Sequence, residues 1–270
     1  MKTQIFRLLC LGDVVGPAAA LFLRRRLPGF RDKTGCDLVI VNGENAARHN
    51  GIDREGMELL FAGGADVITT GNHAFRQKEI REVLDGADFL LRPSNFPDHL
   101  PGRGHTVRRF GGYRVLVANV QGTLFMEPLA SPFEAMEKIL AAEAGKYDFA
   151  VCDIHAEATS EKIAFARTFD GRLAAVFGTH THVPTADWQV LPGGTGYVTD
   201  LGMCGAVASV LGIKTENAVN RFIDHLPTPY APAEGEIRAT GAVFDIDPGT
   251  GKCLAVKPVT ITEDTKEVTS

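Results

Sequence analysis

The sequence of 270 residues predicts an α/β protein whose sheets are covered by helices on both faces. Apolar runs typical of buried strands alternate with patterns typical of helices along most of the chain. Hydrophobic residues make up 44% and charged residues 23% of the chain, which is ordinary for a globular protein. No linker-like tract, internal repeat or low-complexity segment interrupts the pattern, so we expect one domain over residues 1–270, with a short polar tail after about residue 262.

Six apolar runs define the first predicted strands. In chain order they cover residues 5–13, 36–45, 65–73, 113–122, 147–157 and 172–182. Helical patterns lie between them, and Pro17 suits the first turn of the first helix. These helices are predicted at residues 17–27, 54–62, 77–84, 133–144 and 158–169.

The last third of the chain has a different character, with more antiparallel strand. One hairpin is predicted over residues 187–200, turning at Pro192-Gly193-Gly194, and another over residues 236–261, turning at residues 247–251. A helix at residues 216–224 separates the two hairpins.

Charge and cysteine content exclude several classes of protein. The net charge of −5 argues against a broad surface for duplex nucleic acid, which is normally basic. The 5 cysteines are scattered without a CxxC spacing, so we expect a reducing, cytoplasmic location and no zinc knuckle. No apolar run approaches the roughly 18 to 20 residues of a membrane helix, so we expect no membrane partner.

Five predicted strands end in polar side chains that can bind a ligand. In chain order these are Asp13; Asn42, Glu44 and Asn45; Asn72 and His73; Asp153 and His155; and His180 and His182. Each position alone also has a structural interpretation, such as a helix cap for Asp13 or a turn residue for Asn42 that positions its loop. Because ligands of α/β sheets bind beyond the carboxyl ends of strands, the repeated placement favours a binding site. We expect Asp153 on the opposite strand face from His155 and therefore outside the ligand set.

The mixture of donor types indicates metal chemistry. Carboxylate and amide oxygens together with imidazole nitrogens suit iron, manganese or zinc. About seven ligands are too many for one tetrahedral zinc ion and fit two ions that share a carboxylate. Such a pair can clamp the attacking and leaving oxygens of a phosphoryl displacement, which suggests hydrolysis of phosphate esters.

Five motifs carry a resemblance to a known family. GDVVG, NGEN, GNHAF, DIHAE and GTHTHVPTAD resemble the motifs of the calcineurin-like metallophosphoesterases, and more closely those of the bacterial YmdB-type 2′,3′-cyclic-nucleotide phosphodiesterases. The resemblance extends from Asp13 through residues 199–212. Val15 replaces the usual histidine of the first motif, Glu44 replaces a bridging aspartate, and Ala74 replaces an acidic residue. The first two departures are typical of this branch, and the implied fold is a two-sheet αββα sandwich of mixed sheets flanked by helices.

The resemblance also implies a role for each site residue. Asp13, Glu44, Asn45 and His182 would hold one metal ion, and Glu44 would bridge to a second ion held by Asn72, His155 and His180. His73 would be the proton donor to the leaving alkoxide, and imidazole is the usual general acid near neutral pH. The implied reaction is hydrolysis of small phosphodiesters, 2′,3′-cyclic nucleotides above all, by a metal-bridging hydroxide. Iron is the expected metal, with manganese and zinc as alternatives.

Two other functions stay open at this point. The same site could hydrolyse phosphomonoesters, as a phosphatase or nucleotidase does, or serve a metal-dependent regulatory sensor with weak activity. The general-acid candidate His73 favours an enzyme over a sensor. A homo-oligomer is expected on general grounds. The roles of His49 and of residues 199–212 stay open.

Overall fold

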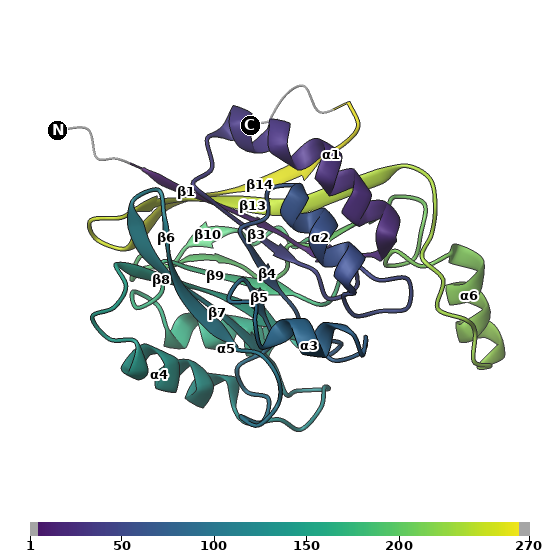
Figure 1. The fold of residues 1–270 in the computed structure, drawn as a ribbon, viewed down its shortest axis with the longest axis horizontal. Helices are drawn as coiled ribbons and strands as arrows, with labels where there is room; N and C mark the ends of the chain where they lie inside the picture. The colour runs from purple at the N-terminus through teal and green to yellow at the C-terminus, as the bar shows by residue number, and fades with distance from the viewer. Residues whose placement is uncertain (1–4, 265–270) are drawn as a thin grey trace.

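Two β-sheets pack face to face in the computed structural model, which describes residues 5–264 (Figure 1). Helices α1 and α2 cover the outer face of one sheet, and α4 and α5 cover the outer face of the other (Figure 1). The predicted αββα sandwich is therefore confirmed.

The first sheet is mixed and has 8 strands. β1, β3, β4 and β5 run parallel to one another, whereas β13 pairs antiparallel with β1, β12 and β14. The order is β2-β12-β13-β1-β3-β4-β5, with β14 also paired to β13. The bounds are β1 (Phe6–Leu11), β2 (Asp13–Val14), β3 (Leu38–Asn42), β4 (Val67–Thr69), β5 (Leu90–Leu91), β12 (Met203–Ala206), β13 (Ile237–Asp247) and β14 (Lys252–Ile261).

The second sheet has 6 strands in the order β10-β11-β9-β8-β7-β6. Its edge strand β6 was not predicted, although Gly111 and Gly112 form the turn of a β6–β7 hairpin with φ angles of 51° and 89°. Both predicted C-terminal hairpins are present, as β10–β11 and as β13–β14. The bounds are β6 (His105–Phe110), β7 (Tyr113–Gln121), β8 (Phe149–His155), β9 (Ala175–Thr179), β10 (Gln189–Val190) and β11 (Gly196–Val198).

The helices match the predicted order, with two differences in length. α1 continues past the predicted end at residue 27 and through Pro28, because Leu27 and Phe30 remain buried against the sheet, and it ends before Gly35 at a φ of 65°. α3 is shorter than predicted because residues 77–79 form a bend followed by a turn. The bounds are α1 (Gly16–Thr34), α2 (Arg54–Ala62), α3 (Ile80–Leu84), α4 (Pro132–Ala142), α5 (Thr159–Thr168) and α6 (Thr215–Asp224).

The layer between the sheets changes from apolar to polar along the strands. Near the start and middle of the strands it contains side chains such as Leu8, Val117 and Val151. At the carboxyl ends the same layer contains buried polar groups from both sheets. These include Asn42, Asn119, Gln121, Asp153, His155 and Thr179. The predicted ligands therefore gather at one end of the sandwich.

Helix α6 stands apart from the sandwich (Figure 1). None of its residues is buried, and its apolar side chains Val219, Phe222 and Ile223 are exposed. Among residues 5–264, no helix is long and apolar enough to span a bilayer.

Candidate metal centre

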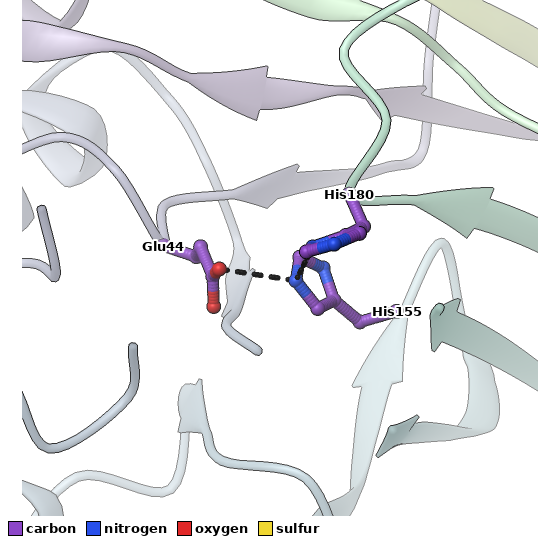
Figure 2. A group of neighbouring side chains, drawn as sticks. All are labelled: Glu44, His155 and His180. Carbon is purple, nitrogen blue, oxygen red and sulfur yellow. Dashed lines mark hydrogen bonds and ion pairs between the residues drawn. The ribbon is translucent and has the colours of Figure 1, made fainter. Parts of the chain in front are cut away.

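Four predicted ligands converge at the carboxyl ends of β3, β4, β8 and β9. His155 Nε2 lies 3.0 Å from Glu44 Oε1, 3.1 Å from Asn72 Oδ1 and 3.0 Å from His180 Nδ1. Donor atoms of Glu44, His155 and His180 all lie within 4.8 Å of one another. Figure 2 shows the Glu44 carboxylate facing the two imidazole rings across a small gap. This group is able to hold a metal ion.

Three further predicted ligands form a second group. His182 Nε2 lies 3.3 Å from the amide nitrogen of Asn45 and 3.7 Å from Asp13 Oδ1. Turning the Asn45 amide through 180° presents its oxygen instead. The other oxygen of Asp13 accepts the His180 backbone N–H at 2.9 Å, which ties the two groups together.

The chemistry of both groups fits metal ions. Asp13 Oδ1 is buried and has no hydrogen-bond partner. Burial raises the pKa of both Asp13 and Glu44, and the neighbouring histidines offset this effect only in part. Burial also lowers the pKa of His155 to about 4 and of His180 to about 3, so both imidazoles are neutral and can offer a lone pair. A bound cation would satisfy the carboxylates and the imidazoles together.

Position 71 accepts only glycine, because its backbone passes close to two of the candidate ligands. A Cβ atom at Gly71 would overlap both the His155 ring and the Glu44 carboxylate. Only glycine therefore allows the backbone of the GNH motif to pass this close to the two side chains.

Each histidine of the two groups also contacts a partner on its outer side. Through these contacts one ring nitrogen is occupied while the other faces the ligand groups, which is the usual arrangement at metal-binding histidines. The contacts are His155 Nδ1 to Thr179 Oγ1 at 2.9 Å, His180 Nε2 to Glu157 Oε2 at 3.2 Å, and His182 Nδ1 to the Leu211 carbonyl at 3.0 Å. None of the three partners was predicted.

The loop that carries His180 and His182 has an unusual backbone. Their φ angles are 102° and 64°, values that residues other than glycine seldom adopt. Asp200 helps to hold this loop by accepting the backbone N–H of Thr181 at 3.1 Å. Asp200 also pairs with Lys162 Nζ at 2.7 Å, and both side chains are fully buried. Residues 199–212, whose role was open, therefore brace the loop through Asp200.

His73 lies beside the ligands but outside them. Its backbone N–H donates to Glu44 Oε2 at 3.1 Å, and its Nε2 lies 3.2 Å from the amide nitrogen of Asn50. Asn50 Oδ1 is buried and has no partner, so reversing this amide lets the oxygen accept a proton-bearing Nε2. The His49 side chain is exposed. Asn42 positions its loop as predicted, because its Oδ1 accepts the Glu44 N–H at 3.1 Å.

The prediction for Asp153 was wrong about its strand face. Residues two apart on a strand share a face, so Asp153 and His155 both point into the layer between the sheets. Asp153 still lies outside the ligand groups. It accepts hydrogen bonds from Thr69 at 2.5 Å, Thr179 at 2.8 Å and Asn42 at 3.0 Å. Burial raises the pKa of Asp153 to about 7, against the opposing effect of these hydrogen bonds.

Comparison with known proteins identifies the family. The family described as YmdB-like protein matches residues 9–259. The chain belongs to the YmdB-like family. A 2′,3′-cyclic-nucleotide 2′-phosphodiesterase of Bacillus subtilis (strain 168) is 41% identical over 258 residues, which cover 96% of this YmdB-like chain and 98% of that protein.

Solved structures support the same assignment. A hypothetical protein from Thermus thermophilus has a TM-score of 0.89 and 41% identity, covering 96% of this chain and 100% of that one. A structure described as a novel phosphatase from Mycoplasma pneumoniae has a TM-score of 0.90 and 33% identity, covering 97% and 95%. The family, the metallophosphoesterase fold and the enzyme class, a phosphoesterase, are confirmed for this YmdB-like protein.

Proposed function

We propose that this YmdB-like protein hydrolyses small phosphodiesters, 2′,3′-cyclic nucleotides above all, with two metal ions. The observation that carries this proposal is the position of Glu44. Its carboxylate lies 3.0 Å from His155 Nε2 in one ligand group, and the next residue along the chain, Asn45, belongs to the other group. The name of the Bacillus subtilis relative supports the choice of substrate.

Each ion has its own set of residues in this proposal, and the two sets share Glu44. When bound, such a pair acidifies water and stabilises charge on the phosphoryl group. The chain's own contribution is to keep its imidazoles neutral, its carboxylates buried and its loops fixed. The sets are Asp13, Glu44, Asn45 and His182 for one ion, and Glu44, Asn72, His155 and His180 for the other.

His73 donates a proton to the leaving alkoxide in the proposed mechanism. Its backbone bond to Glu44 keeps the imidazole next to the ligand groups, and the Asn50 amide fixes the orientation of the ring. A positioned imidazole typically contributes about 10²- to 10⁴-fold to a proton-transfer step. We therefore expect His73→Ala to retain metal and substrate binding while the hydrolysis rate falls by a factor in that range.

The metal content of purified protein tests the proposal directly. We expect about two metal ions per chain in the wild type and loss of both in Glu44→Ala, because this residue serves both sets. Glu137→Ala is a matched control, since Glu137 pairs with Arg172 on the surface. One ion or none in the wild type, unchanged by Glu44→Ala, would contradict the proposal.

Substrate preference separates the diesterase from the phosphatase alternative, which the Mycoplasma pneumoniae relative favours by its description. We expect faster turnover of a 2′,3′-cyclic nucleotide than of the nucleoside monophosphate that its hydrolysis produces. Faster turnover of the monophosphate would favour a phosphatase.

Several finer features remain predictions. We propose iron as the native metal, with manganese or zinc as alternatives, and a cytoplasmic location, which the 5 free, buried cysteines support. The exposed apolar side chains of α6 support a homo-oligomer. One domain over residues 1–270 also remains a prediction, and most of its predicted polar tail lies outside the described residues.

A further inference from the structure

Asp153 is a buried carboxylate that the proposed mechanism does not use. Its side chain is fully buried at the carboxyl end of β8, and within residues 5–264 no ion pair includes it. Its partners are two hydroxyls and an amide, from Thr69, Thr179 and Asn42. Burying a carboxylate without a cation is costly, so its contacts have to explain its presence.

The hydroxyl of Thr179 links Asp153 to a proposed metal ligand. A hydroxyl has one proton to donate and two lone pairs that accept. Thr179 donates its proton to Asp153 Oδ1 at 2.8 Å. Its lone pairs then face Asn42 Nδ2 at 3.2 Å and His155 Nδ1 at 2.9 Å. A hydrogen bond to His155 in this arrangement requires the proton on Nδ1.

The opposite nitrogen of the same ring faces competing acceptors. His155 Nε2 lies 3.0 Å from Glu44 Oε1 and 3.1 Å from Asn72 Oδ1, and both oxygens accept hydrogen bonds. These acceptors favour a proton on Nε2, where it would block metal binding. The contact with Thr179 favours the tautomer that leaves Nε2 with a lone pair.

We propose that Asp153, acting through the Thr179 hydroxyl, holds His155 in the Nδ1–H tautomer and so keeps Nε2 available to the metal. Asp153 and Thr179 are positioning residues in this scheme. The inference rests on the proposed function, because it takes His155 to be a metal ligand.

The outer partners of His180 and His182 differ from that of His155, and the difference explains why these two histidines need no such relay. The outer partner of His180 is the Glu157 carboxylate, and that of His182 is the Leu211 carbonyl. Both partners accept and cannot donate, so each fixes its histidine without help. A hydroxyl can donate or accept a hydrogen bond. The Thr179 hydroxyl therefore needs the Asp153 carboxylate to take its proton, so that it accepts from His155.

The affinity for Zn²⁺, measured by competition with a chromophoric chelator at pH 8, tests the relay. Loss of an outer partner of a metal-binding histidine typically weakens metal binding by about 10- to 100-fold, and we expect that loss in Thr179→Val. Thr179→Ser keeps the hydroxyl and should bind Zn²⁺ as the wild type does. Thr195→Val is a matched control, because Thr195 is a buried threonine whose hydroxyl bonds to the Leu173 carbonyl.

A variant that reverses the direction of the Thr179 hydrogen bonds gives a second test. This test does not depend on whether Thr179→Val folds. In Asp153→Asn the new amide can donate to the Thr179 hydroxyl, which then turns its proton toward His155 Nδ1. We expect ¹⁵N spectra of the metal-free protein to show His155 protonated at Nδ1 in the wild type and at Nε2 in Asp153→Asn. The affinity of Asp153→Asn for Zn²⁺ should fall as well.

Two results would overturn the inference, and they are distinguishable. Zn²⁺ binding at wild-type affinity in both folded variants, with the His155 tautomer unchanged, would remove the relay but leave the proposed function standing. Wild-type affinity in His155→Ala would instead show that His155 is no ligand, and the proposed function would fail with the inference.

Discussion

The two ends of the sandwich treat their carboxylates in opposite ways. At the end of the sandwich where the parallel strands begin, carboxylates pair with cations of the same chain. These pairs are Arg7 with Asp245 at 3.2 Å, Arg31 with Asp66 at 3.0 Å and Arg114 with Asp148 at 2.6 Å. At the carboxyl ends, Asp13, Glu44 and Asp153 are buried among imidazoles, hydroxyls and amides.

The pKa values of the carboxylates shift in opposite directions at the two ends. Hydrogen bonds from Arg114 lower the pKa of Asp148 at the amino end. At the carboxyl end burial raises the pKa of Asp13 and of Glu44. One end of the molecule therefore carries its own compensating charge, whereas in the proposed function the other end receives a cation from outside.

Lys162 is the exception that sharpens this comparison, because it is a chain cation at the ligand end. It is fully buried with Asp200, so Lys162→Met would leave a buried carboxylate without a compensating positive charge. We expect the free energy of unfolding in urea to fall by about 3 to 5 kcal/mol. Arg172→Met breaks the exposed pair with Glu137 and should lower the free energy of unfolding far less, because solvent screens that pair. Equal losses in the two variants would contradict this contrast.

Metal addition should act at the carboxyl end alone. When a ligand that binds only the folded state is present at about 100 times its Kd, the free energy of unfolding rises by about 2.7 kcal/mol. We expect a gain of this size when Mn²⁺ is added to chelator-treated wild type. Asp148→Asn should show the same gain and Glu44→Ala should show none. A gain in Glu44→Ala would place the cation elsewhere.

The smallest expected effect is a pH dependence at the amino end. The pKa of Asp148 is lower in the folded chain than its value of 3.8 for an unperturbed group. The folded state therefore binds fewer protons, and the pair stabilises the fold above the unfolded pKa and loses this effect as pH falls through the folded pKa. Because the pair is exposed, we expect wild type to exceed Asp148→Asn by less than about 1 kcal/mol at pH 7. Urea unfolding at pH 7 and near pH 2 should show the gap closing, and a gap that widens in acid would refute the assignment.

Most of the fold and the convergence of the candidate ligand residues could be predicted because their signals are local. An apolar run that ends in Glu44 or His155 indicates both a strand and the end of the sheet where its polar residues lie. β6 was missed because its mixture of arginines and apolar residues has no apolar run, although the Gly111-Gly112 turn beside it was a usable signal.

The outer partners of the histidines could not be predicted because they depend on strand pairing. Thr179 is a spacer in the GTHTH motif, and its role appears only when β9 lies beside β8 and brings it to His155. The burial of Lys162 has no local signal either, because a lysine on a helix is usually solvated. The strand face of Asp153 was predicted wrongly because residues two apart on a strand share a face.

The ligand groups draw on both sheets at once. Asp13, Glu44, Asn45 and Asn72 lie at or beyond strand ends of the first sheet, and His155, His180 and His182 lie at or beyond strand ends of the second. In the proposed function, an ion bound by residues of both sheets would fasten the two layers together like a rivet. We therefore expect metal occupancy, in the proposed metal-bound state, to slow the separation of the two sheets and so to lengthen the lifetime of the native protein.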